Sequence, residues 1–107
     1  MLKKMLFAVM ALTLAAPAFG ATVYVGQRYY ELDNGLRTDN PWEVYEEIAY
    51  NKDVAIVVMR PDALQSRVND IVETLEKMNI PMIFTKQKNY DEFVKRGALV
   101  PTTLPKK

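Results

Sequence analysis

A run of six consecutive apolar residues, Val54–Met59 (VAIVVM), constrains the fold more than any other part of the sequence. Most of these residues are β-branched, and an unbroken apolar run of this length is typical of a central strand that is buried on both faces. Pro61 ends the run, because proline cannot continue the hydrogen-bond ladder of a central strand. The pattern therefore predicts a sheet with this strand in its interior.

The segment after this strand predicts a helix over residues 62–79 and a second buried strand over Ile80–Thr85. Apolar residues recur at helical spacing along one face of the helix: Leu64, Val68, Ile71, Val72, Leu75 and Met78. Asp62 with Gln65 forms a capping pattern at the start, and Asn79 suits a C-terminal cap. A strand, a helix and a second strand in this order indicate a right-handed crossover with the two strands parallel.

Capping residues predict two further helices. Asn40 can cap the first of them, Pro41 suits its first position, and Glu43 stands where a capping box places an acidic residue. The second is expected over residues 89–96, with Gly97 closing it.

The outer parts of the chain predict the remaining strands. A strand or short hairpin is expected over Thr22–Leu32, ending at the turn signal Asp33-Asn34-Gly35. The tail from Ala98 to Lys107 is expected to carry one short edge strand. We therefore expect an α/β fold, a two-layer sandwich with a small mixed sheet and helices packed mainly on one face.

The N-terminus has the three parts of a secretory signal peptide. Lys3 and Lys4 are followed by an uncharged, mostly apolar run and then by two cleavage sites with small residues, Ala16-Pro17-Ala18 and Ala18-Phe19-Gly20. We expect residues 1–20 to be the signal and residues 21–107 to be a single exported domain, periplasmic or secreted. The alternative is an uncleaved anchor, and only in that case is the membrane an expected partner.

The sequence contains neither cysteine nor histidine. The first absence excludes thiol chemistry and cysteine metal sites, and the second removes the commonest metal ligand and general base. Four carboxylates near the first helix are expected to lie on its solvent face: Glu43, Glu46, Glu47 and Asp53. We expect no enzyme, no catalytic residue, no cofactor and no metal site. A hydrolase that uses the carboxylates around Glu43 is the alternative from another functional class.

The whole chain has a formal net charge of +1, so it lacks the basic excess of a nucleic-acid-binding domain. Arg60 and Asp62 directly follow the predicted central strand, where α/β proteins bind ligands. Two further groups could meet an anionic surface or an acidic partner: Lys86 and Lys88, and Lys95 and Arg96. These six residues are the candidate partner-binding residues. Aromatic residues concentrate in the first half of the domain, and those that face outward would suit an interface.

The segment VAIVVMRPDALQSRVNDIVETLEKMNIPMIF resembles the periplasmic domain of the ExbD/TolR biopolymer-transport family. The likeness is carried by the buried strand, the turn with Arg60 and Asp62, the Arg67-Val68 pair and Ile80 at the next strand. It implies an exported, non-enzymatic module that binds a protein partner or itself through a sheet edge, as in β-augmentation. No acidic residue occurs before Glu31, so the proton-coupling acid of the family's membrane helix has no counterpart here.

A second resemblance is to a thioredoxin-like core that ends near Val100-Pro101-Thr102. The redox cysteines of that family would fall near Pro61 to Leu64, where this chain has none. This resemblance implies, as the alternative function, a cysteine-less accessory protein of the cell envelope or of a secretion system.

Overall fold

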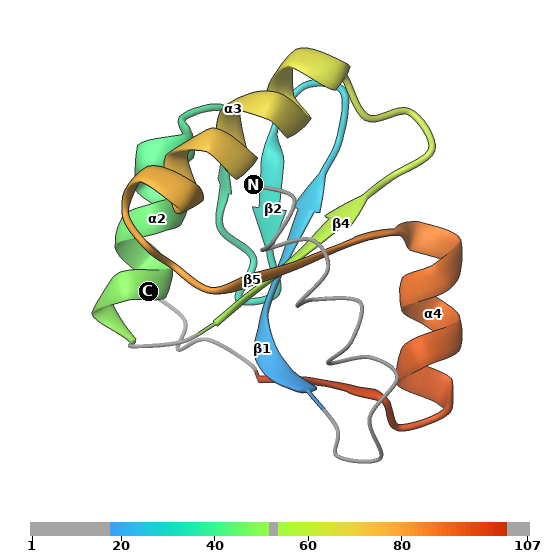
Figure 1. Cartoon of the computed structure of the whole chain (residues 1–107). Helices are drawn as coiled ribbons and strands as arrows, with labels where there is room; N and C mark the ends of the chain where they lie inside the picture. Colours follow the sequence, from blue (N-terminus) through green and yellow to red (C-terminus); the bar gives the residue numbers. More distant parts are fainter. Residues whose placement is uncertain (1–17, 52–53, 103–107) are drawn as a thin grey trace.

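The computed structural model describes residues 18–51 and 54–102, which form one mixed sheet and three helices. The strands are β1 (Ala18–Val25), β2 (Tyr30–Leu32), β3 (Arg37–Thr38), β4 (Ala55–Met59), β5 (Met82–Lys86) and β6 (Leu99–Pro101), and the helices are α2 (Pro41–Tyr50), α3 (Gln65–Lys77) and α4 (Gln87–Lys95). The predicted α/β sandwich with a small mixed sheet is confirmed (Figure 1).

Strand β1 organises the sheet, whose order is β3-β2-β1-β4-β5. Its parallel pairing with β4 runs from Ala21↔Ala55 to Val25↔Met59. On its other side, its first three residues pair in parallel with β6, and its last three pair antiparallel with β2. β4 and β5 are parallel, as the strand–helix–strand order predicted.

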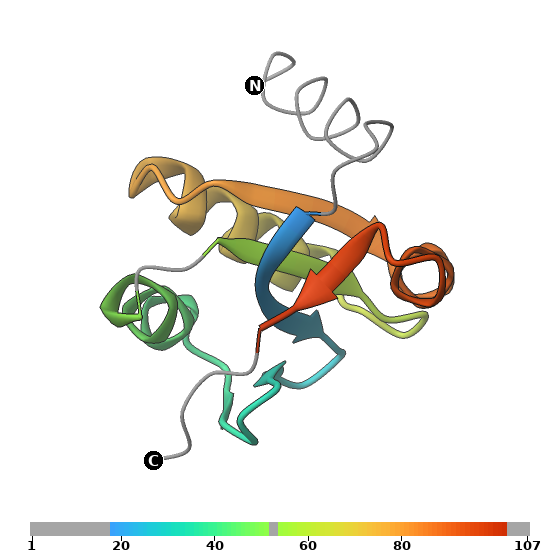
Figure 2. The ribbon, with the colours of Figure 1, turned by 90° about the horizontal axis from the view of Figure 1, so that it is seen from below.

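The helices lie on both sides of the sheet. α2 and α3 cover one face and α4 covers part of the other, as Figures 1 and 2 show from two directions. The larger core cluster lies under α2 and α3 and includes Val23, Val57 and Ile71, all fully buried. The smaller cluster lies under α4 and includes Ile56, Val58 and Tyr90. Helices are therefore packed mainly on one face, as expected.

The run Val54–Met59 is the central strand that the sequence predicted. Ala55, Ile56, Val57 and Val58 have no exposed surface, and they face the two core clusters alternately. Burying a β-branched side chain of this kind contributes roughly 1.5–3 kcal/mol, so this strand anchors both cores.

Strand β5 is less buried than the prediction of a second buried strand over Ile80–Thr85 implied. It pairs with β4, and no other described strand pairs with it. Its side chains alternate, with Ile83 and Thr85 buried and Phe84 40% exposed. The apolar character of Ile80–Thr85 misled the prediction, because an edge strand that carries an exposed phenylalanine resembles a buried one in sequence.

The starts of the helices follow the predictions only in part. Asn40 caps α2 by accepting a hydrogen bond from Trp42 N–H at 3.0 Å, as predicted. Glu43 does not complete the capping box, because its carboxylate accepts instead from the Thr38 hydroxyl. Helix α4 begins at Gln87, before the expected start at Asn89, and Lys86 stands at its N-cap without a side-chain cap.

Both predicted C-terminal caps are confirmed. Asn79 has φ 57° and Gly97 has φ 78°, so both adopt the left-handed conformation that ends a helix. Ile80 N–H donates to Leu75 O at 2.9 Å, and Ala98 N–H donates to Phe93 O at 2.8 Å. These bonds satisfy carbonyl groups that the ends of α3 and α4 would otherwise leave unpaired.

Two further observations bear on the alternatives. Among the described peptide bonds none is cis, so the bond before Pro101 lacks the isomer that would have favoured the thioredoxin-like alternative. Within the described ranges, no helix has the length and apolar character required to span a bilayer. The predicted signal peptide lies outside the described residues except for its last part, Ala18–Gly20, which belongs to β1.

Candidate functional site

The carboxyl ends of β1 and β4 lie side by side at one end of the sheet, and hydrogen bonds join the loops that follow them. Arg60 N–H donates to Val25 O at 3.1 Å, and Leu64 N–H donates to Gly26 O at 3.2 Å. The loop after β1 is closed by a bond from Gly26 N–H to Tyr29 O at 3.1 Å. Open α/β sheets bind ligands at this end, outside the carboxyl ends of their strands.

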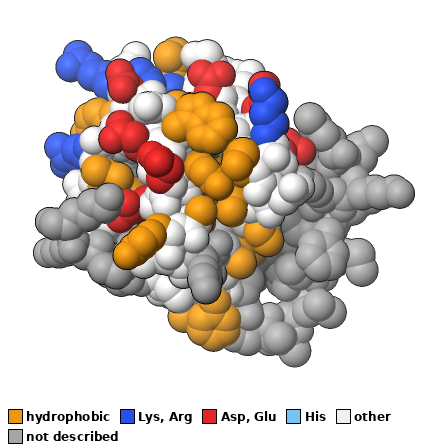
Figure 3. All heavy atoms as spheres, turned by 90° about the vertical axis from the view of Figure 1, so that its left-hand side faces the viewer, with side chains coloured by type: hydrophobic (Ala, Val, Ile, Leu, Met, Phe, Trp, Pro, Cys, Tyr) orange, Lys and Arg blue, Asp and Glu red, His pale blue; other side chains and the backbone are white. Residues whose placement is uncertain are grey.

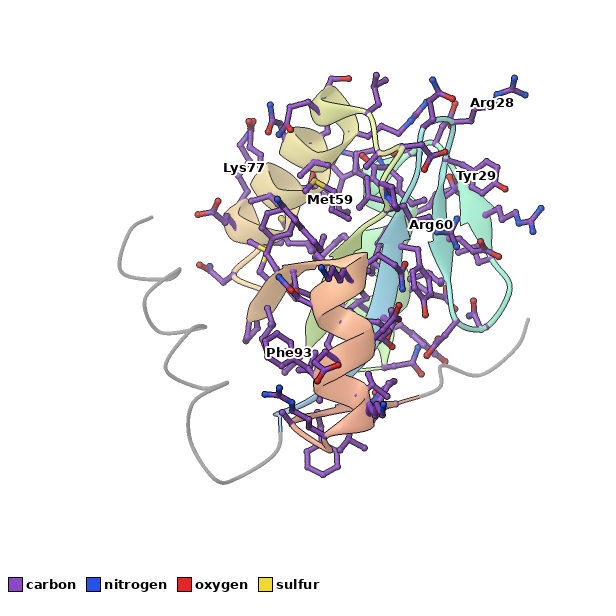
Figure 4. All side chains as sticks on the ribbon, turned by 90° about the vertical axis from the view of Figure 1, so that its right-hand side faces the viewer. Arg28, Tyr29, Met59, Arg60, Lys77 and Phe93 are labelled. Atoms are coloured by element: carbon purple, nitrogen blue, oxygen red, sulfur yellow. The ribbon has the colours of Figure 1, made fainter. Side chains whose placement is uncertain are left out.

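A pocket of about 160 Å³ opens between these two loops. Its lining comes from both of them: Gly26, Gln27, Arg28, Tyr29, Arg60 and Asp62. Figure 4 shows Arg28, Tyr29 and Arg60 beyond the first turn of α4, on a part of the sheet that this helix leaves uncovered. We refer to these six residues as the switch pocket.

Arg60 is held in place by two contacts on this face of the sheet. Its Nη2 lies 2.9 Å from Glu31 Oε1, and its guanidinium carbon lies 4.8 Å from the centre of the Tyr24 ring. Arg37 contacts the other oxygen of the same carboxylate at 3.4 Å. The hydrogen bond from Arg60, aided by the charge of Arg37, lowers the pKa of Glu31 below its ordinary value.

The loop after β1 is also anchored from α3. Arg67 Nε donates to Gln27 O at 3.1 Å, and Arg67 Nη1 donates to Asp39 O at 3.4 Å. The Tyr30 hydroxyl donates in turn to Arg67 O at 2.7 Å. The backbone of the switch pocket is therefore fixed by groups that do not themselves line it.

Asp62 does not have the structural role that the sequence suggested. The N-cap of α3 is Leu64, and no side chain caps this helix. Asp62 is exposed, and no described residue forms an ion pair or a side-chain hydrogen bond with it. Arg28 is also exposed, and no described residue forms an ion pair or a side-chain hydrogen bond with it. The switch pocket therefore contains one cation and one anion that have no partner among the described residues.

The six candidate partner-binding residues do not form one surface. Arg60 and Asp62 share the switch pocket. Lys86 ends β5 and lies at the same end of the sheet, because it is paired in register with Met59, the last residue of β4. Lys88 stands in the first turn of α4. Lys95 and Arg96 stand at the opposite end of this helix, where Arg96 pairs with Glu92 at 3.1 Å. Lys88 and the pair Lys95 and Arg96 are close in sequence, but the length of α4 separates them in space.

The carboxylates around α2 do not form a shared acid–base site. Glu47 is only 5% exposed, which corrects its expected place on the solvent face, and its Oε1 accepts from Asn34 Nδ2 at 3.2 Å. Asp53 lies outside the described residues. Among the described residues, no three acidic side chains come close enough together to hold a metal ion. The buried Glu47–Asn34 contact ties α2 to the turn between β2 and β3.

Tyrosine side chains that are buried or half-buried pack near α4 and α3. Tyr90 and Thr22 share a hydrogen bond of 3.0 Å, and the Tyr24 ring meets the Tyr90 ring edge-on. Burial raises the pKa of Tyr24 well above its ordinary value, and it raises the pKa of Tyr30 to about 12. Both phenols therefore stay protonated at neutral pH.

Large apolar side chains are exposed on several elements. Figure 3 shows hydrophobic side chains gathered among acidic ones on the side of the molecule that carries α2 and α3. The large exposed apolar residues of the described chain are Phe19, Trp42, Tyr50, Leu64, Met78 and Phe84. Phe84 is notable because it belongs to the edge strand β5.

The sequence reasoning found Arg60 and Asp62 but missed the rest of the switch pocket. Gly26, Arg28 and Tyr29 were treated as part of one strand or hairpin, and Glu31 was noted only as the first acidic residue. The available signal was Gly26, which interrupts a Val- and Tyr-rich run and marks the end of β1.

None of the protein family models, curated proteins and solved structures compared with the chain matches it.

Proposed function

We propose that this chain is an exported, non-enzymatic module that binds a protein partner by adding a strand of that partner to the open edge of β5. The observation that carries the proposal is this five-residue edge strand with Phe84 40% exposed on it. An extended segment can pair with the backbone of such an edge while a side-chain pocket or an exposed aromatic residue provides specificity.

The pairing of β5 with β4 determines which backbone groups face outward. Ala55 N–H donates to Pro81 O at 3.0 Å, so in the parallel ladder Ile83 and Thr85 direct their backbone groups toward β4. Met82 and Phe84 direct theirs away from it. No described residue forms a hydrogen bond with these outward groups, so they are available to a partner strand.

The other sheet edges are less suited to this role. β3 has only two residues, and its Arg37 is engaged with Glu31. β6 has three residues and ends at Pro101, which lacks an N–H group. Short strands, charged side chains and proline are common on edges that must not pair with another chain. Of these features β5 has only one, the charged residue Lys86 at its end.

The charges near β5 indicate the kind of segment that would bind. Lys86 ends β5 and Lys88 follows in the first turn of α4; both are exposed and have no ion-pair partner among the described residues. We therefore infer a partner segment that is extended, apolar where it passes Phe84 and acidic beyond Lys86. The resemblance to the ExbD/TolR periplasmic domain and the secretory signal support the exported location.

The proposal is tested by capture of envelope proteins with the purified exported chain and its Phe84→Pro variant. Proline at this position removes an outward N–H together with the phenylalanine ring, and an edge strand tolerates the loss of an outward N–H. Capture should be lost with Phe84→Pro. Phe84→Thr keeps the N–H and removes the ring, so it should weaken capture to an intermediate level.

Tyr50→Thr is the matched control, because Tyr50 is 87% exposed on α2, away from β5. It should capture the same protein as the unaltered chain. If Phe84→Pro folds, as judged by circular dichroism, and captures the same proteins in the same amounts, the proposal is wrong. Sedimentation of the purified chain alone distinguishes a foreign partner from a second copy.

A further inference from the structure

We infer that the switch pocket binds a carboxylate group that stands beside an N–H donor, as in an amino acid or at the C-terminus of a peptide. This inference does not depend on the edge of β5. It rests on two guanidinium groups, one carboxylate and one glycine, which the loops after β1 and β4 bring to the same pocket.

Arg60 presents part of its guanidinium to the pocket in a fixed position. Its Nη2 is engaged with Glu31, and its ring contact is with Tyr24. Its Nη1 lies near Gly26, since a Cβ placed on that glycine would be 3.9 Å from it. A donor that is already oriented loses little conformational entropy when it binds an anion.

Arg28 supplies the second cation. It lines the pocket, it is exposed, and no described residue pairs with it. Its loop is held at both ends, by the bond from Gly26 N–H to Tyr29 O and by the bond from Arg67 to Gln27 O. Guanidinium groups bind carboxylates through paired, charge-assisted hydrogen bonds, and these are among the stronger contacts at a protein surface.

Gly26 keeps the floor of the pocket open. A Cβ at this position would lie 3.3 Å from Tyr29 O, closer than ordinary contact, and 3.9 Å from Arg60 Nη1. The absence of a side chain therefore leaves space for a ligand atom beside the guanidinium.

Asp62 determines which anion fits. Because it lines the pocket and does not cap α3, its carboxylate is free to accept a hydrogen bond from an N–H group of the ligand. Glu31, which does not line the pocket, already pairs with Arg60 and Arg37. A doubly charged phosphate would be repelled by the Asp62 carboxylate, whereas a singly charged carboxylate next to an N–H would satisfy both the guanidinium groups and Asp62.

The inference is tested by titrating the purified exported protein with N-acetylglycine and following its backbone amide NMR signals. The probe carries one carboxylate and one amide N–H. Saturable shifts are expected at residues 26–29 and at Arg60 and Asp62.

Arg28→Gln should weaken binding about tenfold or more, because a hydrogen bond between charged groups is lost. The melting temperature should not change, since Arg28 has no partner in the fold.

Arg96→Gln is the matched control, because Arg96 is also an exposed arginine but lies at the far end of α4. It should bind the probe as the unaltered protein does. If the pocket signals do not shift to saturation, or if the Arg28→Gln variant binds as tightly as the control, the inference is overturned.

Related probes separate the contributions of the two groups. Acetate lacks the N–H and should bind more weakly than N-acetylglycine, and Asp62→Ala should bring the two affinities together. Inorganic phosphate that competes more strongly than N-acetylglycine would overturn the assignment of a carboxylate. A longer peptide with the same C-terminal residue identifies the source: equal affinity indicates a small molecule, and higher affinity indicates a chain terminus.

Discussion

Arg60 Nη2 and Glu31 Oε1 lie 2.9 Å apart and join β4 to β2 across the face of β1. Both side chains are partly shielded, with 31% and 23% of their surfaces exposed. The pair therefore fixes one wall of the switch pocket and also connects three strands of the sheet.

Removing this pair should reduce stability by a modest amount. Glu31→Gln and Arg60→Gln are each expected to lower the free energy of unfolding by about 1 kcal/mol, since partly exposed ion pairs contribute little more. The double variant should lose less than the sum of the two, and chemical denaturation of all four proteins measures this coupling. Strict additivity would show that the two side chains do not interact in solution.

The Glu31 carboxylate should make stability depend on pH in the acidic range. Its pKa in the folded protein is lowered from the ordinary value of 4.5, so the unfolded chain takes up the proton more readily. The stabilisation is complete above this ordinary value and is lost as pH falls through the pKa of the folded state. Denaturation at a series of pH values should show a shallower acidic decline in Glu31→Gln. An unchanged slope would contradict the assignment.

Asn79 should contribute to stability through its backbone conformation. It is the one described residue other than glycine with a positive φ, at 57°. Asn79→Ala is expected to destabilise the protein by about 1 kcal/mol, because the Cβ of alanine disfavours the left-handed region. Asn79→Gly should be neutral or slightly stabilising. Thermal denaturation compares the two, and alanine matching glycine would show that the end of α3 rearranges.

The two cleavage sites of the predicted signal peptide should give products of different stability. Cleavage after Ala18 leaves the pairs Phe19↔Val100 and Gly20↔Pro101 intact, whereas cleavage after Gly20 removes every residue of β1 that pairs with β6. A chain that starts at Phe19 should therefore melt at a higher temperature than one that starts at Ala21. Intact mass of the exported protein shows which product the cell makes.

Gly20 provides an independent check of that part of β1. A Cβ on Gly20 would lie 2.8 Å from Val54 O and 3.0 Å from Ile56 Cγ1, so the two strands approach too closely for a side chain. Gly20→Ala should lower the free energy of unfolding by about 1–3 kcal/mol. Gly35→Ala tests a different constraint, since its cost would come from a φ of 93° in open space. Equal stability of Gly20→Ala and the unaltered chain would show that Gly20 does not pack against β4.

Local patterns in the sequence were sufficient to predict the interior of the sheet. VAIVVM, the amphipathic spacing of the middle of α3 and the caps at Asn40, Asn79 and Gly97 all depend on neighbouring residues, and all were confirmed. The ends of the predicted apolar face, Leu64 and Met78, lie outside α3 and are exposed. The position of β5 at an edge was not predictable in this way, because its exposure depends on which strands lie beside it.

The switch pocket was predicted only where it follows the central strand. Arg60 and Asp62 were placed by their position after VAIVVM, but the residues around them come from β1, the loop after it and β2. The pairing of Arg60 with Glu31 joins residues that are far apart in the sequence, and no local pattern records this contact. Likewise, the burial of Glu47 depends on Asn34 from a different element.

Strand β1 pairs with β2, β4 and β6, and this arrangement affects when the sheet can be completed during synthesis of the chain. Strand β1, the first described strand, pairs with β6, the last described strand, so the outer edge of its first half stays unmatched until residues 99–101 have been synthesised. Contacts between such distant segments form slowly. A polypeptide built in this way is expected to complete its sheet late, and that delay would suit the export that we propose, because a chain passes through a translocation channel before it takes its final form.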